Sequence, residues 1–345
     1  MPECVLICGF GAFGEMHAKA WRLLDPDMIL MVADPSERAR MRASQLGVSA
    51  ERIAADPAVL LESADIVDVV APPAFHLPLA LLALAAGKPV LIEKPAVKSV
   101  SEAKTLLAAS GALPVQVGLV LRAHPLVAQA TQLLGADEIG DLLAIEGDFR
   151  GWKRMRADSS IIENDGVHFL DLMRYFADAA IAHVEARSWS LLDADVADDI
   201  AVELGFPNGV KGRLRLGVLA AGDLEDAFVP GALTTKRLTL MGRKGNISID
   251  FNTNRLTLSK VAYMRSAGGH DVKPDHVSVH AALGATPEVL LARSFAALIE
   301  ATRGNAPVLC DVEQGAREIA AVLAAIDTSL ERQSFTPVAV EGGSS

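Results

Sequence analysis

The 345-residue sequence is poor in cysteine: it contains only three, and no spacing of cysteine and histidine indicates a metal site. Two of them, Cys4 and Cys8, fall on one predicted strand, which holds them roughly 13 Å apart, too far for a disulfide. The sequence therefore predicts no metal and no disulfide framework. Such cysteine usage favours a reducing, cytoplasmic location.

Basic charge is scarce as well. The formal net charge is −11, and basic residues cluster only at Lys153, Arg154 and Arg156, so we expect no nucleic-acid partner. No charged segment precedes the first apolar run, which argues against a signal peptide. The most apolar stretch, residues 66–86, contains several prolines and Asp68. It favours a buried strand followed by a helix over a membrane span.

A glycine-rich turn is the strongest positive signal. Gly9, Gly11 and Gly14 form G-x-G-x-x-G directly after an apolar run, and a helix-like segment and a second apolar run follow, ending in Asp34. This strand–helix–strand–acid context is typical of dinucleotide binding. The first glycine permits the turn, the second admits a pyrophosphate, and the third allows close helix packing. The predicted cofactor-binding residues of the turn are Gly9, Phe10, Gly11, Ala12, Phe13 and Gly14.

Asp34 bears on the choice of cofactor. A carboxylate twenty residues after the last glycine can accept hydrogen bonds from the adenosine ribose and would repel a 2′-phosphate, so NAD is favoured over NADP. Arg38 lies close by and keeps NADP open, because an arginine can bind a 2′-phosphate. A structural alternative is that Asp34 caps a helix that begins at Pro35.

The chain alternates between strands and helices up to about residue 125, which predicts a doubly wound parallel sheet. Thereafter strand-like runs separated by short turns predict an α+β domain with a mostly antiparallel sheet. We expect a Rossmann domain at residues 1–125 and a substrate and oligomerisation domain at residues 126–345. The predicted strands are 5–8, 29–33, 66–70, 90–93, 115–119, 142–149, 183–191, 200–206, 210–217, 237–241, 246–251 and 255–259. The predicted helices are 12–24, 36–46, 77–86, 101–109, 126–134, 165–177, 287–303 and 313–329.

Lys94 follows the predicted strand at residues 90–93 in the sequence Glu93-Lys94-Pro95. The carboxyl ends of parallel strands line the ligand crevice of an open sheet. A lysine there can face the nicotinamide end of the cofactor, bind a substrate hydroxyl and stabilise developing alkoxide charge. Taken alone, a surface lysine before a turn is the simpler interpretation.

Polar side chains also recur at helical spacing near residue 168. If this segment is helical, Asn164, Asp165 and Asp171 share a face with His168. Histidine has a pKa suited to moving a hydroxyl proton near neutral pH. The structural alternative is that Asn164 or Asp165 caps the helix and that His168 is a core histidine.

Together these motifs resemble the Gfo/Idh/MocA family of oxidoreductases over nearly the whole chain. The matching segments are the glycine turn, Pro72-Pro73-Ala74-Phe75-His76, Glu93-Lys94-Pro95, Gly118…Arg122…Pro125, Gly166-Val167-His168-Phe169-Leu170-Asp171, Leu240-Met241-Gly242-Arg243-Lys244-Gly245 and Gly304-Asn305-Ala306-Pro307. The resemblance implies hydride transfer at a carbinol carbon of a sugar, cyclitol or sugar-acid-like substrate. It implies that Lys94 orients the substrate and that His168 is the acid/base.

The same resemblance implies that Pro72, His76, Glu93 and Lys94 lie near the cofactor. One position departs from the family pattern: Asn164 stands where the family usually has aspartate, and an amide cannot accept a proton as a carboxylate can. The neighbouring carboxylates Glu163 and Asp165 would need a shifted geometry to replace it. The predicted substrate-binding residues are Arg122, Trp152, Asn164, Asp165 and Asp171.

Trp152 is included because its indole can stack on a sugar ring. The basic residues after it, Lys153, Arg154 and Arg156, can receive an acidic group, although a solvated loop is an equal alternative for the arginines. The leading prediction is an NAD(P)-dependent dehydrogenase, assembled as a homo-oligomer (dimer or tetramer). The alternatives are a redox-neutral glycosidase or lyase with tightly bound NAD, and a non-catalytic NAD-binding regulator.

Overall fold

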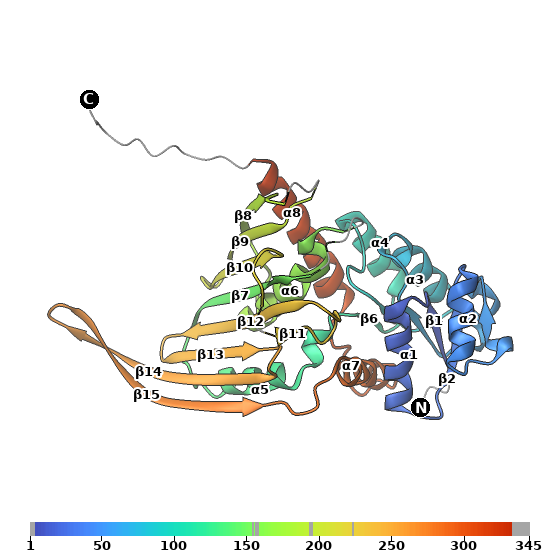
Figure 1. Cartoon of the computed structure of the whole chain (residues 1–345), viewed down its shortest axis with the longest axis horizontal. Helices are drawn as coiled ribbons and strands as arrows, with labels where there is room; N and C mark the ends of the chain where they lie inside the picture. The colour runs from blue at the N-terminus through green and yellow to red at the C-terminus, as the bar shows by residue number, and fades with distance from the viewer. Residues whose placement is uncertain (1–3, 154, 156–158, 193–195, 223, 333–345) are drawn as a thin grey trace.

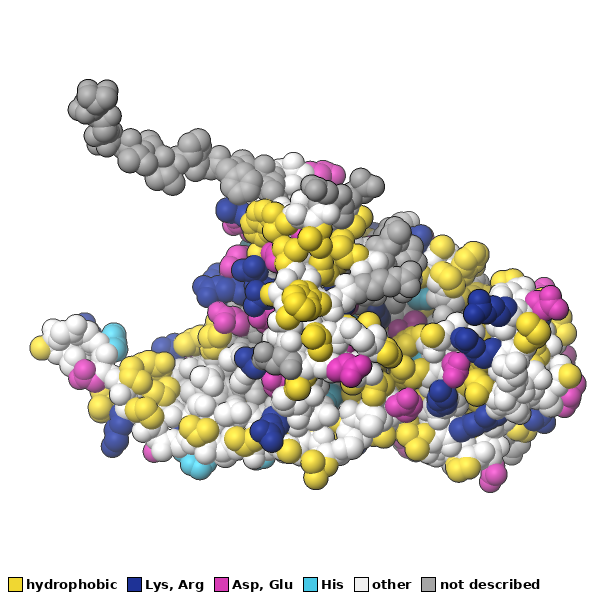
Figure 2. Space-filling model, viewed as in Figure 1, with side chains coloured by type: hydrophobic (Ala, Val, Ile, Leu, Met, Phe, Trp, Pro, Cys, Tyr) yellow, Lys and Arg dark blue, Asp and Glu magenta, His cyan; other side chains and the backbone are white. Residues whose placement is uncertain are grey.

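The structure, a computed structural model, describes residues 4–153, 155, 159–192, 196–222 and 224–332. Two β-sheets organise these residues, one in each half of the chain (Figure 1). The first is parallel with helices around it, and the second is mixed and mostly antiparallel. The predicted fold class is therefore confirmed. On the face shown in Figure 2, acidic and basic side chains are interspersed over both halves.

The first sheet has six parallel strands in the order β3-β2-β1-β4-β5-β6. Its strands are β1 (Cys4–Cys8), β2 (Ile29–Ala33), β3 (Ile53–Ala54), β4 (Ile66–Val69), β5 (Val90–Ile92) and β6 (Val115–Val117). Its helices are α1 (Ala12–Leu24), α2 (Glu37–Gln45), α3 (His76–Ala85) and α4 (Val100–Ser110). The strand order reverses between β1 and β4, so a crevice for a ligand is expected at their carboxyl ends.

The second sheet runs β15-β14-β13-β12-β7-β10-β9-β8, with β11 paired to β12. Only the pairing of β7 with β10 is parallel among its described pairs. Its strands are β7 (Leu142–Trp152), β8 (His183–Trp189), β9 (Asp199–Gly205), β10 (Lys211–Gly217), β11 (Leu224–Glu225), β12 (Leu233–Gly242), β13 (Gly245–Asp250), β14 (Arg255–Ser266) and β15 (Gly269–Ala281). The remaining helices are α5 (Pro125–Gly135), α6 (Val167–Ala177), α7 (Pro287–Thr302) and α8 (Ile319–Glu331).

Strands β14 and β15 form a long hairpin that projects from the sheet (Figure 1). The sequence predicted only residues 255–259 of it and no strand at 269–281. Nearly every residue of β15 is exposed. A strand with no buried face has no alternation of apolar and polar residues, so its sequence pattern carries little signal.

Two helices begin with a wide π-helical turn, at Ile162–Gly166 before α6 and at Glu313–Glu318 before α8. Helix α7 returns from the far end of the chain to pack on α1 (Figure 1). There the ring of Phe295 stacks on Trp21 with centroids 4.3 Å apart. Within the described residues, no helix is both long and apolar enough to cross a membrane.

Candidate active site

The glycine turn joins β1 to α1 at the reversal of strand order. Gly9 has φ +100°, and a Cβ there would overlap the backbone of Ala71, which follows β4. A Cβ on Gly14 would overlap the carbonyl oxygen of Gly9, whereas one on Gly11 would meet nothing within 4 Å. The space beside Gly11 and the α1 N-terminus, which has no side-chain cap among the described residues, fits a dinucleotide pyrophosphate.

Asp34 connects the end of β2 to this turn. One carboxylate oxygen accepts a hydrogen bond from the Phe10 backbone N–H at 2.7 Å, and the other accepts from Ser36 N–H at 2.8 Å. The cap of α2 is Ser36, whose hydroxyl accepts from Ala39 N–H, so the alternative in which Asp34 caps the helix is wrong. Arg38 is exposed, and the Phe10 side chain is buried in the core.

His76 ties together the loops after β4 and β5. Its Nδ1 lies 2.8 Å from the carbonyl oxygen of Pro95 and its Nε2 lies 2.7 Å from that of Ala71. Burial lowers the pKa of this imidazole, and a neutral ring can donate to only one of the two carbonyls. His76 is 1% exposed, and its contacts with the two loops hold the loop that carries Lys94 in position. Pro72 is exposed.

Glu93 points into the first domain. Its Oε1 lies 3.5 Å from His17 Nε2, and its Oε2 accepts a hydrogen bond from the Lys94 backbone N–H at 3.1 Å. Gly118 leaves the necessary room, because a Cβ there would overlap Oε1. These contacts make Glu93 a support for the Lys94 backbone.

Lys94 reaches from the first domain to the second. Its Nζ donates a hydrogen bond of 2.5 Å to the backbone carbonyl of Asn164, in the π-helical turn before α6. The charge of Lys94 also acts on His168. The structure therefore brings the lysine and histidine motifs together.

The turn before α6 is π-helical, whereas the sequence analysis assumed α-helical spacing there. Residues 162–166 are π-helical, so Asn164 and Asp165 do not follow the α-helical positions that were expected to align them with His168. The side chain that caps this segment is Ser160, whose hydroxyl accepts a hydrogen bond from the Glu163 N–H, so the capping alternative for Asn164 and Asp165 is also wrong. Glu163 instead accepts hydrogen bonds from Ser160.

Asp165 is held between two neighbours. The Asn164 amide donates to its Oδ1 at 3.0 Å, and Lys153 Nζ lies 2.6 Å from its Oδ2. The side chains of Asp165 and Lys153 are 8% and 5% exposed. Both carboxylate oxygens of Asp165 are therefore already in contact with neighbouring side chains.

His168 is held in its neutral form. Burial lowers its pKa well below 6.5, and the nearby charges of Lys94 and Lys236 lower it further. Its Nδ1 is buried and has no hydrogen-bond partner among the described residues. A neutral imidazole at neutral pH is able to accept a proton.

Lys236 was not predicted as a site residue. Its Nζ lies 2.7 Å from one oxygen of Asp226, which also accepts from the Thr234 hydroxyl at 2.8 Å. Lys236 and Asp226 are 8% and 2% exposed. The available signal was a lysine at an inward position of an alternating strand, β12.

Arg122 and Asp171 bind each other rather than Lys94 or His168. The guanidinium donates to both carboxylate oxygens, with the closest contact at 2.6 Å. Arg122 also donates to the Leu309 carbonyl and to Gln314. The pair is buried, and it connects the end of the first domain to α6 and to the C-terminal segment.

Trp152 lies at the end of β7 and is 57% exposed, with its indole N–H donating to the Leu219 carbonyl at 2.9 Å. Arg154 and Arg156, also considered from the sequence, lie outside the described residues. No group of three or more His, Cys, Asp or Glu side chains among the residues described is placed to hold a metal ion.

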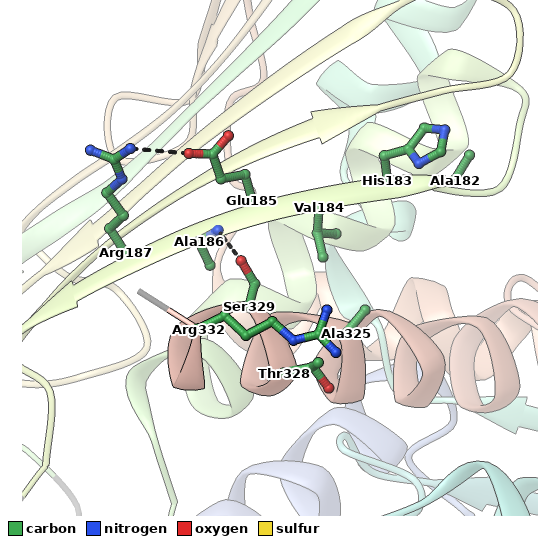
Figure 3. Close-up of a pocket in the computed structure, with 10 residues that line it drawn as sticks. All are labelled: Ala182, His183, Val184, Glu185, Ala186, Arg187, Ala325, Thr328, Ser329 and Arg332. Carbon is green, nitrogen blue, oxygen red and sulfur yellow. Dashed lines mark hydrogen bonds and ion pairs between the residues drawn. The ribbon is translucent and has the colours of Figure 1, made fainter. Parts of the chain in front are cut away.

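A cavity of about 530 Å³ lies elsewhere, between β8 and α8 (Figure 3). Glu185 and Arg187 pair at 3.1 Å on its strand side, and the Ser329 hydroxyl accepts from the Ala186 N–H at 2.9 Å. None of its lining residues is a predicted site residue.

The fold and this site define an NAD(P)-dependent dehydrogenase that acts on CH–OH groups. Residues 4–119 match the oxidoreductase family with an NAD-binding Rossmann fold, and residues 127–248 match the GFO/IDH/MocA C-terminal domain. The chain belongs to the Gfo/Idh/MocA oxidoreductase family.

Several of its relatives are named sugar or cyclitol dehydrogenases. Inositol 2-dehydrogenase 2 of Saccharopolyspora erythraea is 27% identical over 69% of this chain and 76% of that protein. The scyllo-inositol 2-dehydrogenase (NAD(+)) of Bacillus subtilis is 27% identical over 72% and 80%. Among solved structures, the UDP-N-acetylglucosamine 3-dehydrogenase of Acidithiobacillus ferrooxidans superposes with a TM-score of 0.76 at 23% identity, covering 95% of this chain and 98% of that one.

Proposed function

We propose that this enzyme oxidises a secondary alcohol of a sugar, cyclitol or sugar acid, with NAD as the preferred acceptor. The observation that carries the proposal is a contact between the two domains: Lys94 of the first domain binds the turn that directly precedes His168 and acts on the histidine. The inositol dehydrogenases at 27% identity support a polyhydroxylated substrate.

His168 acts as the base in this proposal. Its lowered pKa leaves the imidazole neutral at neutral pH, ready to accept the proton of the substrate hydroxyl. Lys94 donates to the hydroxyl oxygen and stabilises the alkoxide that develops there. The bound nicotinamide supplies the hydride acceptor. Asn164 and Asp165 contribute to substrate binding around that oxygen. The buried ion pair of Arg122 and Asp171 keeps α6 in position.

NAD preference follows from Asp34, whose carboxylate lies at the end of β2 against the glycine turn. A cofactor phosphate at this position would meet its negative charge. The measurement is kcat/KM with each cofactor, and we expect NAD to be favoured. Equal or better use of NADP would overturn this part and direct attention to the exposed Arg38.

Turnover of myo-inositol, scyllo-inositol, levoglucosan and UDP-N-acetylglucosamine, followed by NADH formation, tests the reaction. Stoichiometric NADH release supports a dehydrogenase, whereas product without net NADH indicates the redox-neutral alternative. NAD binding without any turnover indicates a regulator.

The proton acceptor is tested by pH–rate profiles of wild type, His168→Ala and Asp165→Ala. We expect His168→Ala to remove the acid limb and most of the rate. Asp165 is the rival group, although Lys153 and Asn164 already bind it. Loss of the limb in Asp165→Ala alone would transfer the role to the carboxylate.

We also propose a homo-oligomer, a dimer or tetramer, in a reducing cytoplasm. The hairpin β14–β15 exposes Tyr263, Val272, Val277 and Val279, which supports contact with a second copy. The three cysteines are free and buried, which supports a reducing location. Light scattering over a concentration series measures the assembly, and a monomer at all concentrations would contradict it.

A further inference from the structure

Side chains of the first domain hold the backbone on both sides of Lys94. Glu93 Oε2 accepts a hydrogen bond from the Lys94 N–H at 3.1 Å. The carbonyl oxygen of the next residue, Pro95, lies 2.8 Å from Nδ1 of the buried His76. At the far end of the lysine side chain, Nζ donates to the Asn164 carbonyl of the second domain. The place of the ammonium group therefore depends on these anchors.

The Glu93 carboxylate occupies a seat that fits it closely. Its side chain is 7% exposed, and a Cβ on Gly118 would overlap both Oε1 and the carboxyl carbon. His17 Nε2 lies 3.5 Å from Oε1, which is longer than an ordinary hydrogen bond, so the attraction between these groups is mainly one between charges. Glycine on one side and a histidine on the other thus define where this carboxylate lies.

His17 is in turn fixed from its opposite side. Its Nδ1 lies 2.9 Å from Asp68 Oδ2, which also accepts a hydrogen bond from Trp21 Nε1 at 2.8 Å. Burial alone would lower the pKa of His17, but Asp68 and Glu93 raise it, so the imidazole carries the charge that attracts Glu93. A continuous chain of buried polar contacts therefore runs from α1 and β4 to the Lys94 backbone.

Stability alone does not account for this chain of contacts. Buried ion pairs stabilise a fold little compared with apolar packing of the same volume. This chain ends on the N–H of the residue that meets the substrate oxygen in the proposed reaction. We propose that Glu93, held by His17 and seated against Gly118, is a positioning residue that sets the place of the Lys94 ammonium group. The inference rests on the proposed dehydrogenase function, and it gives Glu93 a role toward Lys94 rather than toward the cofactor.

The first readout requires no reaction. The full-length enzyme, without substrate, is treated with a limiting amount of acetic anhydride, and mass spectrometry measures the acetylation rate of Lys94 relative to that of Lys98. Lys98 is exposed and lies four residues further along the chain, so it is the internal reference. The second readout is kcat and KM for a compound that the enzyme oxidises, together with the Kd of NAD by calorimetry.

Two variants disturb Glu93 in different ways. Glu93→Gln keeps the length of the side chain and an oxygen for the Lys94 N–H, but it removes the charge that faces His17. Gly118→Ala keeps both charges and displaces the carboxylate from its seat. We expect each variant to raise the relative labelling of Lys94 and to lower kcat about tenfold or more, because a small misplacement of a reacting group slows the reaction strongly. KM and the Kd of NAD should change little.

A double variant tests the link to His17. His17→Gln should give the same pattern, and the kcat of His17→Gln with Glu93→Gln should lie within about twofold of that of Glu93→Gln, because coupled residues do not act additively. Multiplied losses would show that His17 does not act through Glu93. Leu106→Ala, which removes a fully buried side chain from α4, is the control for lost stability and should keep wild-type kcat and Lys94 labelling.

The outcomes separate this inference from the proposed function. Weaker NAD binding by Glu93→Gln with unchanged Lys94 labelling would mean that Glu93 binds the cofactor directly, and the inference would be wrong. Wild-type kcat and labelling in Glu93→Gln and Gly118→Ala, or equal changes in Leu106→Ala, would also overturn it and leave the dehydrogenase function intact. Raised labelling in both Glu93→Gln and Gly118→Ala, when wild type forms NADH from no compound, supports the positioning role and contradicts the proposed reaction.

Discussion

One histidine in each domain has a strongly shifted pKa, and the two shifts have opposite directions. In the first domain, His17 Nδ1 lies 2.9 Å from Asp68 and its Nε2 lies 3.5 Å from Glu93. Burial alone would lower its pKa, but the charge and hydrogen bonds of Asp68 and Glu93 outweigh burial and raise the pKa to about 10. In the second domain, burial and two lysines lower the pKa of His168.

The opposite pKa shifts distinguish His17, which supports the fold, from His168, which is suited to react. Asp68 also accepts a hydrogen bond from Trp21 Nε1 at 2.8 Å, so the His17 cluster is an ion pair inside a packed core. Such a histidine stays protonated near neutral pH and does not release its proton there. His168 stays neutral beside cations, which suits proton transfer.

Replacing His168 is expected to have the largest effect on rate. His168→Ala should slow turnover on the order of 10³-fold, because general base catalysis is removed, while Tm stays close to wild type. His183→Ala, an exposed histidine on β8, is the control. A folded His168→Ala enzyme with near-normal kcat would place the base elsewhere.

Replacing His17 should instead act on stability. His17→Ala leaves Asp68 buried without its cation, and we expect the free energy of unfolding to fall by about 3 kcal/mol. Urea denaturation of wild type, His17→Ala and His183→Ala measures this. If His17→Ala left stability unchanged but greatly lowered kcat, His17 would be the reactive histidine and the comparison with His168 would be wrong.

The two histidines should also respond to pH in opposite windows. The folded-state pKa of His17 lies above its unfolded value of 6.5, so its stabilisation is complete below pH 6.5 and is lost as pH rises through about 10. The difference in unfolding free energy between wild type and His17→Ala should therefore shrink over that range. If the difference in unfolding free energy instead grew with pH, charged His17 would not be stabilised by Asp68 and Glu93.

For His168 the acid limb of kcat/KM should lie well below the usual histidine range. The double variant Lys236→Met, Asp226→Asn removes one of the two cations that lower this pKa, and its limb should move upward. Lys211→Met, which changes an exposed lysine at the start of β10, serves as the control. A limb that stays in place would show that Lys236 does not act on the titrating group.

The smallest effect is expected at Asn164. Lys94 binds its backbone carbonyl, which Asn164→Ala retains, so only the amide hydrogen bond to Asp165 is lost. We expect KM to rise a few-fold and kcat to change by less than about threefold, since one such bond contributes about 1 to 2 kcal/mol. If turnover instead slowed as strongly as expected for loss of a group acting on developing charge, the Asn164 side chain would have a direct part in the reaction.

Much of the fold followed from periodicity. The continuous apolar strands of the first sheet, such as β1, and the alternating strands of the second, such as β10, were predicted to within a few residues. The edge strand β3 has two residues and β15 has no buried face, so neither produced a pattern. The π-helical turn before α6 was missed because an α-helical period was assumed.

The site was only partly visible in the sequence. Lys94 and His168 were found because each lies in a short motif at the end of an element. Lys236 and Asp226 were not, because their ion pair forms only when β11 and β12 fold together. Arg122 and Asp171 were expected at the substrate, but each is bound by the other, a contact between residues 49 positions apart.

The contact of α7 with α1 sets an order for synthesis of the chain. The last strand of the first sheet ends at Val117, but Phe295, which stacks on Trp21 and lies 5.1 Å from the His17 ring, is made much later. At ribosomal speeds of about 5–20 residues per second, the delay is on the order of ten seconds. During that time the nascent first domain exposes the apolar face of α1. We therefore expect chaperones that bind apolar surfaces to engage this domain before the C-terminal helices emerge.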